Sequence, residues 1–519
     1  MTQWLNDSMM KSPHFRWLAA ALSGLLLVAC FPKPAFYPLA WIADLPLLLA
    51  LLAESNAWRA FAWGYLCGAI YFGGNCYWFV EVTRQYGGLR PILALATLLL
   101  FVLVFSAFFG VFGLGVRAVA RRSRPLALFS SPFLWVAMEL GRYHLLTGFP
   151  WDLLGYAVSP AGLRQIASLT GVYGLSFLAF STTALAAWLV LDWRKKWPCF
   201  ALAAWVVLLL LGNWAFAPPP PLRGPNLALL VQPNVPLEEA AASSWAPWLN
   251  PAKLNQLVNL SLDTLAAEER ERTPPLASPA LILWAENPAP FYFTRDPVFR
   301  NAVQGMARQG RAYVVVNAVV PLGPGASRIT NSAIVIDPQG REILQYDKMH
   351  LVPFGEYVPA WAFPDLIGKI TAEVGDFVPG TGYRVAPTPE GAIGVFICYE
   401  DIFPDLVRRI ARAGAAVLVN ISNDAWYGRS AAAFQHLEMA RLRAIENRRY
   451  LLRATNNGVT ALIDPYGRVE KQTAPYQMVA LPVDFSYRQS QTFYTRHGDL
   501  FAWLCTALAA TALLRAAAG

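Results

Sequence analysis

Three residues with reactive side chains follow or lie between apolar segments in the C-terminal half of the chain. Glu286 comes after the apolar run 281–285, Lys348 lies in a polar segment before His350, and Cys398 directly follows the apolar run 395–397. A thiol can act as a nucleophile, a carboxylate can accept its proton, and a fixed ammonium group can stabilise a thiolate or an oxyanion. Together these residue types could transfer an acyl group through a thioester.

Each of the three residues also has an explanation that needs no chemistry. A single cysteine after an apolar strand usually packs in a core, a lone lysine is usually solvated, and a glutamate at a strand end is often exposed or caps a helix. The catalytic interpretation adds that a helix begins after Cys398, so its N–H groups would favour the thiolate.

A layered α/β domain is predicted to position these side chains. Pro218–Pro221 prevents helix continuation, and beyond it short runs rich in Val and Ile alternate with polar helical stretches. We predict strands at 226–232, 281–285, 312–320, 332–337, 392–398, 416–421, 450–455 and 459–463. We predict helices at 250–269, 297–309, 403–413 and 431–448.

The first half of the chain predicts a membrane bundle. Hydrophobic residues make up 56% of the sequence and charged residues only 14%, whereas soluble proteins carry about 25% charged residues. Apolar runs long enough to cross a bilayer recur seven times before residue 217 and once near the C-terminus. These predicted spans are 15–31, 37–53, 58–81, 92–118, 127–144, 167–191, 197–216 and 498–515.

The placement of charge orients the predicted bundle. Residues 1–221 carry 15 of the 42 Lys and Arg residues but only 7 of the 33 Asp and Glu residues. The basic excess lies between spans, mostly in the segments that would be cytoplasmic if the N-terminus is inside. This distribution argues against nucleic-acid binding and places the α/β domain outside the cytoplasm. Residues 27–30 resemble a lipoprotein cleavage site, but the spans that follow favour a first transmembrane helix.

The order and the residue sequences of the motifs resemble those of a known family. Glu286, then Tyr346-Asp-Lys348-Met-His350, then Ile397-Cys398-Tyr399-Glu400 resembles the nitrilase (carbon–nitrogen hydrolase) superfamily over about residues 225–485. The resemblance implies a Glu–Lys–Cys triad on an α-β-β-α sandwich. With the predicted spans, almost the whole chain is similar to the bacterial apolipoprotein N-acyltransferase family. The further motifs that carry this likeness are His350–Glu356, Asn420–Trp426 and Thr455–Thr460.

The second resemblance implies both an architecture and a topology. It implies a membrane α-helical bundle of about eight transmembrane helices joined to the nitrilase-like domain. The expected divisions are residues 1–217 for seven transmembrane helices, 218–490 for the extracytoplasmic catalytic domain, and 491–519 for the last helix with a cytoplasmic C-terminus. The expected location is the bacterial inner membrane, which the chain would cross several times, with the catalytic domain on the periplasmic side. The protein is expected to be a monomer.

The resemblance also implies a two-step reaction without a cofactor or metal. Cys398 would take an acyl chain from a phospholipid, phosphatidylethanolamine being the expected donor, with Glu286 as base and Lys348 stabilising the oxyanion. The amine of the diacylglyceryl-cysteine of an apolipoprotein would then attack the thioester. The resemblance further assigns supporting roles in the active site to Glu356, Tyr399 and Glu400. It also points to a lid tryptophan at Trp248, with Trp245 as a rival, and to an apolar arm at 359–368.

Two alternatives remain open at this point. A membrane-anchored amidase or hydrolase would use the same triad with water as the acceptor. A transporter with a soluble domain would need paired charges inside the spans, for which Glu139 and Arg142 are the nearest candidates. A zinc site is not favoured, because His436-Leu-Glu438 is not followed by Pro-Cys-x-x-Cys.

Overall fold

The computed structural model describes residues 13–85, 87–221, 224–235, 251–286, 292–323, 328–357 and 376–518. Trp245, Trp248 and the predicted arm at 359–368 lie outside these residues. The chain forms two compact units, which are divided at Pro218/Pro219 and at Arg496/His497, and residues 85–88 are grouped with the second. We call the first the helical unit and the second the sandwich unit.

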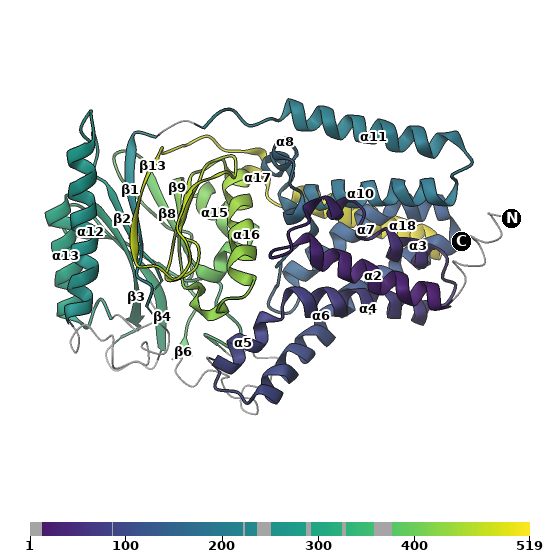
Figure 1. The fold of residues 1–519 in the computed structure, drawn as a ribbon, viewed down its shortest axis with the longest axis horizontal. Helices are drawn as coiled ribbons and strands as arrows, with labels where there is room; N and C mark the ends of the chain where they lie inside the picture. Colours follow the sequence, from purple (N-terminus) through teal and green to yellow (C-terminus); the bar gives the residue numbers. More distant parts are fainter. Residues whose placement is uncertain are drawn as a thin grey trace. The chain divides into compact units, whose positions relative to one another are not determined.

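The regular secondary structure of the helical unit, in the residues described, consists of helices (Figure 1). The longer ones are α2 (Pro13–Cys30), α4 (Ala57–Asn75), α6 (Pro91–Arg122), α7 (Arg124–His144), α10 (Val172–Leu191), α11 (Lys196–Ala215) and α18 (Leu500–Ala517). Shorter ones are η1 (Tyr37–Trp41), α3 (Leu45–Leu52), α5 (Trp78–Gln85), η2 (Leu154–Ala157), α8 (Ala161–Arg164) and α9 (Ala167–Thr170).

Four of the described helices are long and apolar enough to cross a membrane: α6, α10, α11 and α18. All eight predicted spans contain helix, but three are interrupted. In the span predicted at 58–81, α4 ends at Asn75 and α5 begins at Trp78. In the span predicted at 37–53, η1 and α3 are separated at Ile42–Asp44. In the span predicted at 167–191, Gly171 has a φ of +67° and divides α9 from α10. The number of eight crossings therefore stays a prediction.

Glycine allows α4 and α6 to pack closely. A Cβ atom on Gly64 of α4 would lie 2.2 Å from the carbonyl oxygen of Phe109 in α6, and one on Gly113 would lie 2.4 Å from that of Ala60. Both distances are far below van der Waals contact, so no larger residue fits. Small residues at such contacts are the usual means by which membrane helices approach each other.

Glu139 and Arg142 of α7 connect the helix to the segment that follows it. Glu139 Oε1 accepts hydrogen bonds from the indole N–H of Trp135 at 3.0 Å and from the backbone N–H of Leu154 at 2.8 Å. The guanidinium of Arg142 donates to the carbonyl oxygens of Phe149 and Trp151. Both charged side chains thus have local structural partners, which gives a reason for their burial other than a transport pathway.

Two mixed β-sheets form the centre of the sandwich unit (Figure 1). The first has the order β13-β1-β2-β3-β4-β5, with β6 paired to β4, and the second has the order β12-β11-β10-β9-β8-β7. Strands of the first sheet are β1 (Asn226–Gln232), β2 (Leu281–Trp284), β3 (Tyr313–Pro321), β4 (Arg328–Ile336), β5 (Glu342–Asp347), β6 (Asp376–Phe377) and β13 (Val479–Phe485). Those of the second are β7 (Val385–Ala386), β8 (Ala392–Ile397), β9 (Ala415–Ser422), β10 (Leu451–Thr455), β11 (Ala461–Ile463) and β12 (Val469–Gln472).

Helices cover the outer face of each sheet. Helices α12 (Pro251–Glu271) and α13 (Pro297–Gly310) pack on the first sheet, and α15 (Pro404–Arg412) and α16 (Ala432–Asn447) pack on the second (Figure 1). Alternate β1 residues Leu227, Leu229 and Val231 join the core beneath α12 and α13. All seven β1 residues are buried, so the other face is covered as well. The predicted α-β-β-α sandwich is therefore confirmed.

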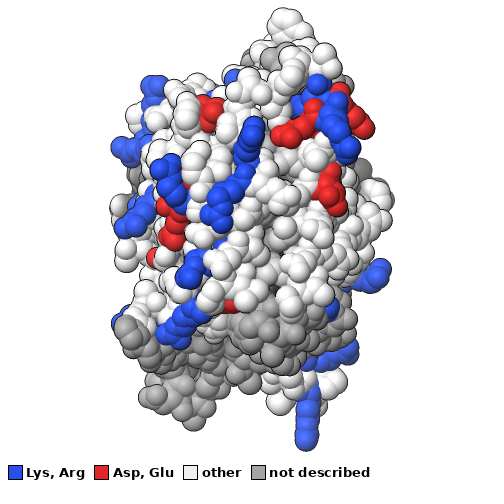
Figure 2. All heavy atoms as spheres, turned by 90° about the vertical axis from the view of Figure 1, so that its left-hand side faces the viewer, with Lys and Arg blue, Asp and Glu red and all other residues white. Residues whose placement is uncertain are grey.

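The predicted strands and helices of this unit all occur, with limits shifted by a few residues. The largest shift is in β4, which begins at Arg328 rather than at residue 332. Strands β5, β6, β7, β12 and β13 were not predicted. On the side of α12 and α13, basic and acidic side chains are interspersed on the surface (Figure 2).

Candidate active site

The triad candidates lie just beyond the C-terminal ends of three strands. Glu286 is two residues past the end of β2, Lys348 directly follows β5, and Cys398 directly follows β8. All three are buried, with 7%, 1% and 5% of their surface exposed. The structure thus brings together in one sandwich three residues that are distant in the sequence. Glu286 and Cys398 are 112 positions apart.

Cys398 occupies a constrained turn. It is the first residue of the short 3-10 helix η5 (Cys398–Ile402), and its φ is +48°. Residues other than glycine rarely adopt this left-handed conformation, and residues held in such strained conformations cluster at active sites. The strand–turn geometry therefore supports the cysteine as the nucleophile.

Burial of Cys398 disfavours the thiolate form that the neighbouring helix N–H groups would favour. Burial raises the pKa of the Cys398 thiol, and Glu286 raises it further, whereas Lys348 and the hydroxyl of Ser422 act in the opposite direction. Desolvation disfavours the charged form, and the five residues of η5 do not overcome it. The resting group is a thiol that must transfer its proton when it reacts.

Lys348 is held between two carboxylates. Its Nζ donates to Oε1 of Glu356 at 3.0 Å and lies 3.5 Å from Oε1 of Glu286. Burial alone would lower the pKa of Lys348, but Glu356, Glu286 and Cys398 together hold it above its usual value. The side chain is therefore a permanent cation beside the thiol.

Glu286 and Glu356 share a donor that the sequence did not reveal. The amide Nδ2 of Asn331 in β4 donates to Glu286 Oε1 at 2.9 Å and to Glu356 Oε1 at 2.8 Å. The amide of Asn317 in β3 donates to Asn331 Oδ1 at 2.7 Å, which fixes the orientation of that side chain. The signal that could have identified Asn331 is the polar run 330–332 inside an otherwise apolar strand.

The segment after β9 contributes a second contact that sequence reasoning missed. The backbone N–H of Asn423 donates to Glu286 Oε2 at 3.0 Å. Glu286 therefore accepts one hydrogen bond on each oxygen, from Asn331 and from Asn423. These contacts fix the direction in which the carboxylate faces.

Glu400 connects the lysine loop to the cysteine turn. Its carboxylate accepts hydrogen bonds from the backbone N–H groups of Met349 at 2.6 Å and Ile397 at 2.7 Å, and from the hydroxyl of Tyr346 at 2.9 Å. Burial raises the pKa of Glu400 to about 7, although these donors act against the rise. Its geometry supports a positioning role, since it holds the residues next to Lys348 and Cys398.

Tyr399 is buried against other rings. Its ring centroid lies 5.3 Å from that of Phe403 and 5.8 Å from that of His350. Hydrogen bonds or electrostatic contacts join five of the predicted site residues: Glu286, Lys348, Glu356, Cys398 and Glu400. The predicted lid tryptophan, Trp248, lies outside the described residues. No group of three or more His, Cys, Asp or Glu residues in the described part of the chain could hold a metal ion.

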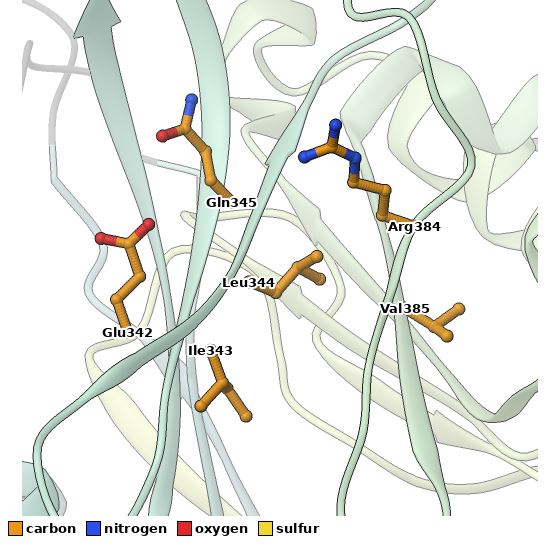
Figure 3. A pocket seen from close by; sticks show the side chains of 6 residues that line it. All are labelled: Glu342, Ile343, Leu344, Gln345, Arg384 and Val385. Carbon is orange, nitrogen blue, oxygen red and sulfur yellow. The ribbon is translucent and has the colours of Figure 1, made fainter.

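One surface hollow lies away from this cluster. It is lined by residues 342–345 of β5 and by Arg384 and Val385 at β7 (Figure 3). None of the residues discussed above lines it. The candidate site is therefore defined by the buried cluster and not by this hollow.

Comparison with known proteins identifies the family. Residues 23–185 match the family described as the apolipoprotein N-acyltransferase N-terminal domain, and residues 265–484 match carbon–nitrogen hydrolase. An apolipoprotein N-acyltransferase of Geobacter metallireducens is 38% identical over 509 residues, covering 96% of this chain and 94% of its relative. The chain belongs to the apolipoprotein N-acyltransferase family.

Other relatives support the same family. The apolipoprotein N-acyltransferase of Pseudomonas aeruginosa is 32% identical over 530 residues, covering 97% of this chain and 95% of that protein. Among solved structures, an amidase from Nesterenkonia sp. is 19% identical, with a TM-score of 0.36, and the match covers 53% of this chain and 94% of the amidase. This membership favours acyl transfer over the hydrolase and transporter alternatives.

Proposed function

We propose that this protein moves an acyl chain from a phospholipid to the N-terminal amine of diacylglyceryl-cysteine in an apolipoprotein, through a thioester on Cys398. Family membership over nearly the whole chain supports the overall reaction. The observation that carries the mechanism is the buried cluster in which Lys348 lies 3.5 Å from Glu286 and interacts electrostatically with Cys398. Nucleophile, base and cation are thus close together in a site of low polarity.

In the first step the Cys398 thiol attacks the ester carbonyl of the phospholipid as its proton passes to Glu286. A tetrahedral oxyanion forms, and the ammonium group of Lys348 stabilises it. Collapse of the intermediate breaks the ester bond, the proton on Glu286 passes to the leaving oxygen, and a lysophospholipid departs. The thioester remains on the enzyme.

In the second step the free amine of the diacylglyceryl-cysteine attacks the thioester. Glu286, again ionised, takes a proton from the amine, and the sulfur leaves and regains a proton as the thiol. The product is an amide, so the apolipoprotein carries a third acyl chain. Glu356 keeps Lys348 charged and in place, and Tyr399 and Glu400 hold the loops beside the nucleophile.

Phosphatidylethanolamine is the proposed donor, and intact mass spectrometry tests it. The full chain in detergent is incubated with phosphatidylethanolamine alone, beside Cys398→Ser. The wild type should gain one acyl mass that hydroxylamine removes, and the variant should gain no hydroxylamine-labile mass. Adding a diacylglyceryl-cysteine peptide should move the acyl group to its amine. Release of free fatty acid without amide formation would instead support a hydrolase.

The proposed location is the bacterial inner membrane, with residues 1–217 and 491–519 in the bilayer region and residues 218–490 on the periplasmic side. The apolar helices α6, α10, α11 and α18 support membrane crossing, and a monomer is sufficient for the mechanism. The orientation predicts that the loop before α11 is cytoplasmic. Arg194→Cys in a Cys199→Ser background places a thiol in that loop and provides the test. An impermeant maleimide should label it in lysed cells but not in intact spheroplasts.

A further inference from the structure

The peptide group that joins Ser422 to Asn423 is held from both sides. Its N–H, that of Asn423, donates to Glu286 Oε2 at 3.0 Å. Its carbonyl oxygen, that of Ser422, accepts a hydrogen bond of 3.0 Å from the backbone N–H of Asn456. The N–H and the C=O of a trans peptide point in opposite directions. Asn456 therefore holds the side of this peptide that is opposite Glu286.

The side chain of Asn456 holds Asn423 a second time. Its Nδ2 donates to Oδ1 of Asn423 at 3.1 Å. The same oxygen accepts a hydrogen bond of 3.2 Å from the backbone N–H of Ala425. A turn of Asn423 away from Glu286 would have to break at least one of these bonds.

Asn456 is itself bound to the first sheet. The backbone N–H of Val235 donates to Asn456 Oδ1 at 2.8 Å, and the carbonyl oxygen of Val235 accepts from Nδ2 at 2.9 Å. The N–H of Asn234 also donates to the carbonyl oxygen of Asn456 at 2.8 Å. Asn234 and Val235 follow β1, which is parallel to β2, and Asn456 directly follows β10, which is parallel to β9. These bonds therefore join the two sheets at the edge where Glu286 and Cys398 lie.

Burial makes these bonds costly to lose. Asn456 and Val235 have no exposed surface, and Asn423 has 1%. Bulk water cannot replace a lost partner there, and a buried, multiply bonded network holds its members in one arrangement. A residue that only tied the strand ends together would need its bonds to Val235, but not those that hold the peptide facing Glu286.

We infer that Asn456 is a positioning residue for the general base, because it holds the Ser422–Asn423 peptide with its N–H directed at Glu286. The inference rests on the proposed role of Glu286 as the base for Cys398. Asn456 acts on Glu286 through Asn423, and no covalent bond to Asn456 forms or breaks. Without its side chain, Asn423 can turn, and the carboxylate spends less time aligned with the thiol.

The test is alkylation of Cys398 by iodoacetamide at neutral pH, measured by peptide mass spectrometry on the full chain in detergent. The sulfur displaces iodide while the thiol proton passes to Glu286. Asn456→Ala removes the side-chain bonds but keeps the backbone bond to Ser422. Alkylation should therefore slow about fivefold, the effect of losing one neutral hydrogen bond.

A second background separates positioning from a merely structural role. In Glu286→Gln the base is gone, so the added change Asn456→Ala should slow alkylation no further. A structural role would slow alkylation by the same factor in both backgrounds. Asn423→Ala keeps the bonds between Asn456 and Val235 but removes the link to Asn423 Oδ1, so it should give the same pattern.

Gln232→Ala is the matched control. Gln232 is fully buried at the end of β1, and its Nε2 donates to the carbonyl oxygens of Ala474 and Gln477. The change removes a comparable set of buried bonds and leaves those between Asn456 and Asn423 in place. The control should be alkylated at the wild-type rate, and thermal melting shows which variants are folded.

Three results would overturn the inference. They are wild-type alkylation of a folded Asn456→Ala or Asn423→Ala protein, equal slowing with and without Glu286, and equal slowing by Gln232→Ala. With phosphatidylethanolamine, Asn456→Ala should lower the saturating acylation rate and leave the half-saturating concentration unchanged. Alkylation itself requires no lipid. A protein that shows the predicted alkylation pattern yet forms no acyl adduct would contradict the proposed function alone.

Discussion

Replacing Asn331 by alanine tests the idea that one amide aligns both carboxylates of the site. The change removes the hydrogen bonds of 2.9 Å to Glu286 and 2.8 Å to Glu356. Hydrogen bonds to charged groups contribute about 1.5–3 kcal/mol each. Glu286 keeps its bond from Asn423, and Glu356 keeps its bond from Lys348, so neither carboxylate is left without a partner.

We therefore expect the loss to correspond to one charge-assisted hydrogen bond in the transition state. At 1.36 kcal/mol for each factor of ten, acylation of Cys398 should slow about 10- to 150-fold. Asn317→Ala should have a smaller effect, because the amide of Asn317 acts on the two carboxylates through its bond to Asn331. The measurement is the single-turnover rate of acyl-enzyme formation with excess phosphatidylethanolamine, followed by intact mass.

Ser332→Ala is the matched control, because it lies next to Asn331 in β4. Its hydroxyl contacts Thr330 and Asp347 and neither of the two carboxylates. The control should acylate at the wild-type rate when the thermal midpoint shows that it is folded. A folded Asn331→Ala protein that acylates as fast as Ser332→Ala would refute the alignment role.

Three further variants test other parts of the site. Glu356→Gln removes the closer negative partner of Lys348, so acylation should slow about tenfold at neutral pH while the melting temperature changes little. Burial raises the pKa of Glu400 to about 7, so the folded protein keeps a proton that the unfolded chain releases above pH 4.5. The free energy of unfolding should therefore fall by about 3 kcal/mol as the pH rises from 4.5 to 7. Glu400→Gln should flatten this pH dependence of the melting temperature, and an equal slope in both proteins would contradict the assignment. Gly458→Ala would place a Cβ atom 2.3 Å from Asp424 Oδ2, so it should lower the melting temperature and slow acylation together.

The sequence was sufficient to predict the sandwich because its strands follow strong local patterns. Runs such as 227–231 and 415–419 are apolar throughout, as expected for strands covered on both faces. Strand β5, which ends directly before Lys348, was missed for the opposite reason. It lies at the edge of its sheet and alternates buried with partly exposed residues, so it contains no apolar run.

The positioning residues could not be predicted because their partners are distant in the sequence. Asn331 and Glu286 are 45 residues apart, and Asn423 and Glu286 are 137 residues apart. The polar run 330–332 suggested that the strand began after it. Only pairing with β3 and β5 shows that these residues lie inside a sheet. The burial of Cys398, which disfavours its thiolate form, could not be read from the sequence either.

Burial of the triad is compatible with catalysis because the activating proton transfer conserves charge within the cluster. Before transfer, Lys348 is positive, Glu356 and Glu286 are negative, and Cys398 is neutral; afterwards the charge of Glu286 has moved to the sulfur. A single thiolate made by releasing the proton to water would add a second net negative charge to a buried site, which is costly. The distances favour the internal route, since Lys348 is 3.0 Å from Glu356 but 3.5 Å from Glu286. Glu356 thus serves as the constant partner of the lysine and leaves Glu286 available to exchange the proton with Cys398.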